Sequence, residues 1–193
     1  MALDQFKKIK SVKVSGMDLE KFKQSLRRLA ETEILVGVPA TNASRPDAGG
    51  ITNAAIGYIA EFGAPERNIP ARPWLMPVIR DEQDKIGSDL GKVANLVLRG
   101  SPPAVIDRGL HAVGIRVVAD IKGRITTGLE PPLADSTLYS RASRGDEGAA
   151  WELAWRRTGV ADLNGQLAKP YILTGNFLKS ITYVLAGRRR NGP

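Results

Sequence analysis

Two long apolar stripes, separated by a short break, constrain the fold of this chain more than any other feature. In both, apolar residues recur at spacings that place them on one face of a helix. The first stripe comprises Leu75, Ile79, Ile86, Leu90, Val93 and Val97, and the second comprises Ile106, Leu110, Val113, Val117 and Ile121. Gly100 is expected to end the first helix, with Ser101 capping the second and Pro102 in its first turn. We expect two long helices that form an antiparallel hairpin or a bent rod.

Short segments on either side of these helices predict a small sheet. Residues 34–38 form a continuous apolar run ended by Pro39, which predicts a buried strand. Residues 180–185 alternate and predict a final strand. The lysine-rich residues 8–14 are typical of an exposed edge strand, and the apolar spacing over 17–31 predicts a helix. The fold class is therefore α+β, with a small, mostly antiparallel sheet packed against long α-helices.

The chain, residues 1–193, is expected to form a single domain with two extended loops. Residues 39–52 are rich in Asn, Ser, Gly and Pro, and residues 126–170 show little periodicity. Within the second loop, only residues 146–157 predict a short helix, which carries Trp151 and Trp155. We expect both loops to become ordered mainly against neighbouring subunits or other proteins.

Composition limits the chemistry available to this chain. It contains no cysteine, which excludes disulfides and thiolate metal sites. It has no apolar run near the roughly 20 residues that a membrane-spanning helix needs, and no secretory signal is expected at its N-terminus. Its formal net charge of +8 is compatible with a solvated surface, an acidic protein partner or nearby DNA.

No catalytic, metal-binding or cofactor-binding pattern emerges from the sequence. His111 is the only histidine, and Asp107 lies four residues earlier on the same predicted helix, which does not make a triad by itself. The acidic residues Asp81, Glu82 and Asp84 are expected to form the solvated face near a helix start. We therefore predict that the protein is not an enzyme and that it binds no metal or cofactor.

Three segments carry a resemblance to a known family. Residues 57–75 combine an apolar stretch stopped by Gly63 and Pro65 with Ile-Pro-Ala-Arg-Pro-Trp-Leu, and similar blocks occur at residues 131–138 and 169–183. In this order they resemble the "EFG…IPARPWL", "PPLSPSTL" and "KPLIDTGQLLKSITY" segments of tailed-bacteriophage virion-morphogenesis and tail-completion proteins. The family usually has aspartate where this chain has Leu173. The matching positions expected to be structural include Glu61, Phe62, Gly63, Pro70, Thr174, Gly175, Ser180 and Tyr183.

The resemblance implies a structural virion protein that completes the tail or joins head and tail at the phage neck. It implies a homomeric ring, most often a hexamer, around the DNA path, in contact with neck, connector and tail-tube proteins and with no membrane. Such a protein is made in the host bacterial cytoplasm and resides in the virion. Two alternatives stay open, namely a basic DNA-binding accessory protein of phage assembly and a phage hydrolase or tail lysin.

Five residues are candidates for a subunit interface. Arginine and tryptophan dominate binding hot spots, and a rigid Arg-Pro-Trp corner and a tryptophan pair on one helix face would both suit such a contact. The candidates are Arg72, Pro73, Trp74, Trp151 and Trp155. The alternative for the corner is internal, with Trp74 packed under the long helix and Arg72 paired with Glu61. The alternative for Trp151 and Trp155 is burial in the core, and Phe62 is expected to lie in the core as well.

Overall fold

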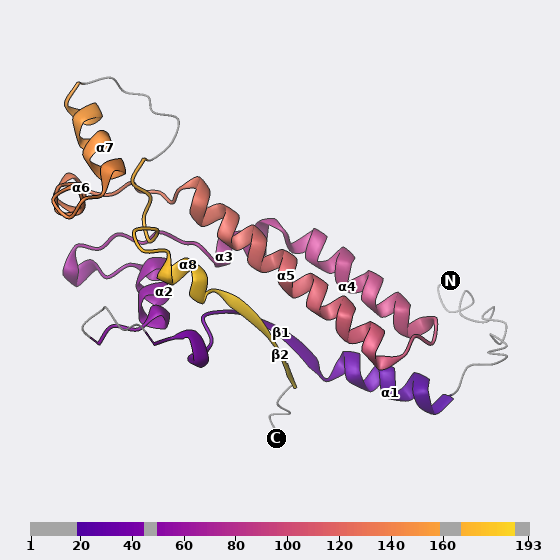
Figure 1. The fold of residues 1–193 in the computed structure, drawn as a ribbon. Coiled ribbons are helices and arrows are strands. Elements are labelled where there is room, and N and C mark those ends of the chain that lie inside the picture. The colour runs from indigo at the N-terminus through magenta and orange to yellow at the C-terminus, as the bar shows by residue number, and fades with distance from the viewer. Residues whose placement is uncertain (1–18, 45–49, 159–166, 188–193) are drawn as a thin grey trace, which may run out of the picture.

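Two long helices lie side by side through the centre of the molecule (Figure 1). The computed structural model describes residues 19–44, 50–158 and 167–187. Helix α4 spans Gln83–Leu98 and helix α5 spans Pro103–Thr127, and they pack against each other as the two stripes predict. The first stripe is interrupted, because α3 (Met76–Asp81) ends at Glu82 before α4 begins. Pro102 rather than Ser101 is the N-cap residue of α5, so the predicted serine cap is wrong.

A two-stranded antiparallel sheet packs on α5. Helix α1 (Leu19–Ala30) leads into β1 (Thr32–Gly37), which pairs with β2 (Thr182–Gly187) from Thr32↔Gly187 to Gly37↔Thr182. One face of both strands contacts α5, and the other face is open to solvent. Leu35, on the open face, is 51% exposed, so the prediction that this strand is fully buried is wrong. The reason is that α5 covers one side of the sheet only.

Short helices lie at the end of the molecule that contains the segments resembling a known family. Helix α2 (Asn53–Phe62) is capped by Thr52, whose hydroxyl accepts from the Ala55 N–H, and α2 packs against α8 (Asn176–Ser180). The 3-10 helices η2 (Ala40–Asn42) and η3 (Pro65–Arg67) flank α2 in the chain. The predicted edge strand at residues 8–14 lies outside the described residues.

Helices α6 and α7 pair with each other and project from the main body (Figure 1). They span Asp135–Ala142 and Glu147–Arg157, and the first of them was not predicted. A small separate core explains why this segment is ordered within the chain itself. It contains Leu133, Leu138, Ala149 and Ala168, with Ala142 and Leu153 packed against it. The described part of residues 126–170 is therefore largely helical rather than an extended loop.

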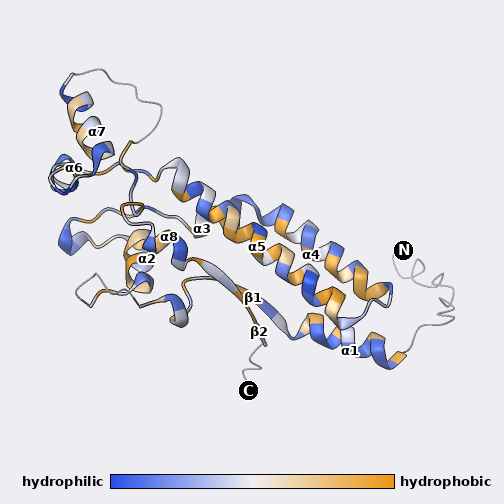
Figure 2. Cartoon of the chain, viewed as in Figure 1, coloured by the Kyte–Doolittle hydropathy of each residue, from blue (hydrophilic) through white to orange (hydrophobic). Residues whose placement is uncertain are grey.

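The main core joins α5 to α1, α3, α4 and both strands. Hydrophobic residues recur along α4 and α5, where the chain buries them against one another (Figure 2). The buried members on these two helices and α8 include Val93, Val97, Ile106, Leu110, Val113, Val117, Ile121, Ile125 and Phe177. Among the described residues, no helix is both long and apolar enough to cross a membrane.

Candidate functional site

The three segments that carry the family resemblance meet in one place. Residues 57–75 form α2 and the loop into α3, residues 131–138 enter α6, and residues 169–183 contain α8 and the start of β2. Side chains from the first segment bond to the backbone of the second and pack on the third. We call this meeting point the motif junction and define it by Glu61, Arg72, Trp74, Pro131 and Phe177.

Glu61 is the polar centre of the motif junction. Its buried carboxylate accepts three backbone N–H groups, from Trp74 and Leu75 at 2.9 Å each and from Met76 at 3.0 Å. These N–H groups lie at the start of α3, where a helix has no internal acceptors for them. The carboxylate therefore fixes the direction in which the chain leaves the loop, and its negative charge suits a helix N-terminus.

Trp74 is the apolar centre of the same junction. Its side chain is 4% exposed and packs edge-on against Phe177, with ring centroids 5.2 Å apart. Its indole N–H donates to the Gly57 carbonyl oxygen at 2.9 Å, so the one polar atom of the ring is satisfied. Trp74 thus joins α2, the loop before α3, and α8.

Arg72 connects the first segment to the second. Its guanidinium donates to the carbonyl oxygens of Pro131 at 2.6 Å and Pro132 at 2.9 Å, while its own backbone N–H donates to the Ala60 oxygen. Burial raises the pKa of the neighbouring Tyr171 hydroxyl, although the charge of Arg72 opposes that shift. The predicted pairing of Arg72 with Glu61 is wrong, because both partners are committed to backbone groups instead.

Two glycines allow close approaches that a side chain would block. Gly63 has φ +76°, and a Cβ there would lie 2.8 Å from the Ala71 nitrogen, so α2 turns at this point only with glycine. Gly114 on α5 lies directly under the Tyr183 ring, where a Cβ would come within 2.4 Å of a ring carbon. The Tyr183 hydroxyl in turn lies 2.9 Å from His111 Nδ1.

Among the remaining motif positions, three contribute hydrogen bonds or a cap at α8, and one has no evident role. The Ser180 hydroxyl donates to the Phe177 carbonyl at 2.7 Å, and Gly175 is the N-cap residue of α8. The Thr174 hydroxyl accepts from the Asn176 N–H, but only at 3.4 Å. Pro70 is exposed on the loop.

The predicted interface residues divide into internal and external ones. Arg72 and Trp74 are buried and Pro73 is half-buried, so this corner offers no large exposed side chain to another subunit. For Arg72 and Trp74 the structure therefore corrects the interface prediction in favour of an internal role. Trp151 is 69% exposed on α7, while Trp155, one turn later, is half-buried. Trp151 thus remains available for a contact.

Phe62 was expected to lie in the core, but its side chain is at the surface. It lies between the structural residues Glu61 and Gly63, yet it is 61% exposed, so the core assignment is wrong. Tyr58, one helical turn earlier and 66% exposed, contacts it with ring centroids 4.9 Å apart. The i,i+4 spacing of two aromatics signals this surface pair, but sequence alone does not show that α2 turns it outward.

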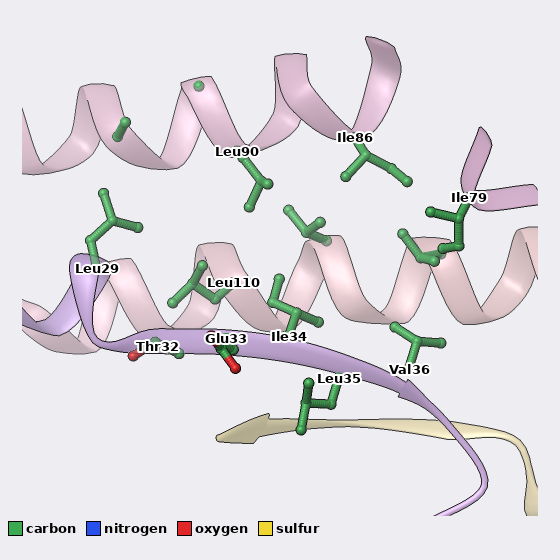
Figure 3. A pocket seen from close by; sticks show the side chains of 14 residues that line it. Leu29, Thr32, Glu33, Ile34, Leu35, Val36, Ile79, Ile86, Leu90 and Leu110 are labelled. Carbon is green, nitrogen blue, oxygen red and sulfur yellow. The ribbon is translucent and has the colours of Figure 1, made fainter. Parts of the chain in front are cut away.

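An apolar groove between β1 and α4 was not predicted at all (Figure 3). Its volume is about 770 Å³, and α5 forms its floor. We call it the β1 groove. Its lining includes Ile34 from β1, Ile86 and Leu90 from α4, and Leu110, Val113 and Val117 from α5. These residues belong to apolar stripes that predict burial in the core. The sequence pattern therefore did not indicate that they would line a groove.

The titratable groups make ion pairs rather than a reactive cluster. Arg116 is shared among Glu82, Asp89 and Asp120, and Arg28 pairs with Asp107 at 2.9 Å. The hydrogen bond from Lys92 lowers the pKa of Asp89. Within the described residues, no three metal-ligating side chains come together. His111 contacts Tyr183 rather than Asp107, which pairs with Arg28 instead.

No protein-family model, curated protein or solved structure matches this chain.

Proposed function

We propose that this chain is a structural virion protein of a tailed bacteriophage, which completes the tail or joins it to the head as a homomeric ring. The motif junction is the observation that carries the proposal. Three segments that resemble one family, separated by about 55 and 30 residues in the sequence, pack against each other through Arg72 and Trp74.

The roles of the motif residues also suit an architectural protein. The side chains of Glu61, Arg72 and Trp74 form hydrogen bonds with the backbone of their own chain. Such residues fix a shape, and a ring component needs a fixed shape because each copy must repeat the same rotation to close the ring. The surface then supplies the contacts, through features such as the β1 groove and the exposed Trp151.

The DNA-binding alternative has less support from the described surface. Arg116, Arg141 and Arg156 each pair with carboxylates, which reduces the positive field they offer to a phosphate backbone. Positive charge near the DNA path remains compatible with a ring whose lumen DNA crosses.

Deleting the gene for this chain from its phage tests the proposal. We expect complete heads and complete tails that fail to join, or tails whose ends are irregular. Supplying the wild-type chain should restore joining. As a matched control, His111→Ala should restore joining as well as the wild type does, because the proposal gives His111 no chemistry. Normal virions after deletion would contradict the proposal, and a folded, incorporated His111→Ala chain that yields non-infectious virions would favour an enzyme.

A further inference from the structure

We propose that the exposed side of α2 binds the exposed side of α7 in a neighbouring copy of this chain. The contact joins two different surfaces, as a closed ring of identical copies requires, so it rests on the proposed function. It gives that ring a named interface, with Tyr58 and Phe62 on one copy and Trp151 on the next.

The exposed side of α2 carries no charged residue. Its exposed residues are Ala54, Tyr58 and Phe62, which recur every fourth position and therefore lie on one face of the helix. We call these three residues the α2 ridge. The only charged residue of α2, Glu61, is buried. A surface helix normally turns a polar face to solvent, so α2 has the composition of a helix that is covered on both sides.

The two rings of the α2 ridge are of the kind that anchors protein interfaces. Tyr58 and Phe62 contact each other, and both are largely open to solvent. Aromatic residues are enriched at the centres of protein–protein interfaces and charged residues are depleted there. The α2 ridge combines both properties, which favours a protein partner over solvent.

Helix α7 presents a second exposed surface of the same kind. Its exposed residues are Glu147, Ala150, Trp151, Ala154 and Arg157, so charge is confined to the two ends of the helix. The small side chains of Ala150 and Ala154 let another helix come close to the ring of Trp151. The α6–α7 pair projects from the main body (Figure 1), and a small core of its own stabilises it there. This position suits a contact with another molecule.

The two surfaces do not cover each other within one chain, because Tyr58, Phe62 and Trp151 are each at least 61% exposed. Each copy therefore offers one α2 ridge and one Trp151 surface, which can bind two different neighbours. Repetition of this contact with a fixed rotation closes a ring. A two-fold contact of α2 with α2 would instead close a dimer and leave Trp151 uncovered.

The area of the three rings fits a repeated contact better than a stable dimer. A buried aromatic side chain removes about 150–250 Å² from water, so three rings that are about two-thirds exposed contribute roughly 400 Å². A specific pair of proteins typically buries about 1,600 Å² in total. One α2–α7 contact therefore holds a pair of copies weakly, and every copy gains a second contact only when the ring closes.

Cross-linking between mixed copies tests the contact, because the chain has no cysteine of its own. One full-length chain carries Ala54→Cys and the other carries Ala150→Cys, and both positions are exposed and leave the three rings in place. The purified chains are mixed at high concentration with a thiol-specific cross-linker about 10 Å long, close to the distance between two packed helices. We expect dimers that contain one copy of each chain. They should form at least about tenfold faster than dimers of either chain with itself, because docking raises the effective concentration.

Two controls separate a docked contact from random encounter. Ala119→Cys, at an exposed position on α5, replaces Ala150→Cys and should give only the slow rate. Adding Tyr58→Ser and Phe62→Ser to the Ala54→Cys chain should lower the mixed rate to that of the Ala119→Cys control. The matched surface change Leu98→Ser, at an exposed leucine at the end of α4, should leave the mixed rate unchanged. Circular dichroism confirms that each variant is folded.

Three results would overturn the proposal. Fast dimers of the Ala54→Cys chain with itself would indicate a two-fold α2 contact, and equal rates for the Ala150 and Ala119 positions would leave the α2 ridge to a different partner. An unchanged mixed rate in a folded chain without the Tyr58 and Phe62 rings would remove those rings from the contact. The cross-linking uses purified protein, so mixed dimers together with normal virions after gene deletion would support the contact and reject the virion role.

Discussion

The motif junction and the β1 groove differ in what their side chains contact. At the junction, Glu61, Arg72 and Trp74 are buried, and their side chains form hydrogen bonds with the backbone of the chain. At the groove, apolar residues of β1, α4 and α5 line a space that the described residues leave open. The buried residues of the segments that resemble a family thus build the subunit, while the groove is lined by ordinary apolar stripes. Residues that carry a sequence motif can therefore serve the fold of their own chain rather than a contact surface.

Truncation of Trp74, in the motif junction, should have the largest effect on the stability of the chain. We expect Trp74→Ala to lower the free energy of unfolding by about 3–5 kcal/mol, because it removes a large buried ring and its packing on Phe177. The matched change Trp151→Ala, at a tryptophan that is mostly exposed, should shift it by no more than about 0.5 kcal/mol. Urea unfolding of both variants measures the difference, and equal effects would show that Trp74 is not a core residue.

Glu61→Gln should give the next largest effect. The amide keeps the size of the carboxylate but has one acceptor oxygen in place of two, so at least one buried N–H at the start of α3 loses its partner. A buried donor left unsatisfied costs about 1–3 kcal/mol. The exposed Glu66→Gln serves as the control, since Glu66 lies on the surface of the same loop. Similar midpoints for the two variants would contradict a capping role for Glu61.

Asp146 should make a smaller contribution that depends on pH. Its carboxylate caps α7 by accepting from the Ala149 N–H and pairs with Arg141. Burial opposes its ionisation, but the hydrogen bonds from Arg141, Ala149 and Gly148 outweigh burial and lower its pKa. A lowered folded-state pKa means that the stabilisation is present above the unfolded-state pKa and is lost as the pH falls through the folded-state pKa.

We therefore expect Asp146→Ala to cost about 1 kcal/mol near neutral pH. The difference from the wild type should shrink when unfolding is measured at pH values below the ordinary aspartate range. A pH-independent difference would mean that the charge of Asp146 contributes nothing and that its effect is steric.

A substitution on the solvent-facing side of β1 should have the smallest effect on the stability of the isolated chain. Leu35→Lys changes a half-exposed side chain and should alter the free energy of unfolding by no more than about 0.5 kcal/mol. Ile34→Lys, one residue earlier on the core-facing side, should cost several times more. Equal costs would mean that both faces of β1 are covered.

The sequence predicted the parts of this fold that depend on local periodicity. The α4–α5 hairpin follows from apolar spacing, and both strands were placed within one or two residues of β1 and β2. The α+β class followed from those elements. The sequence did not predict α6, because its helix is stabilised by the small core around Leu138 rather than by a stripe of its own.

The roles of the motif residues could not be predicted because they depend on tertiary contacts. Glu61 and Arg72 are a plausible ion pair in the sequence, yet each binds backbone groups that the fold brings to it from elsewhere. Phe62 looks like a core residue, but α2 directs Glu61 inward and Phe62 outward. The β1 groove depends on how far α4 stands from β1, which no residue pattern specifies.

A reconstruction of the phage particle that carries this chain tests the central claim most directly. The account predicts a closed ring of identical copies in the neck or at the head-proximal end of the tail, with the DNA path through its centre. In that ring the motif junction should lie inside each subunit. Single copies on the capsid surface, or a particle that lacks the chain, would contradict the account.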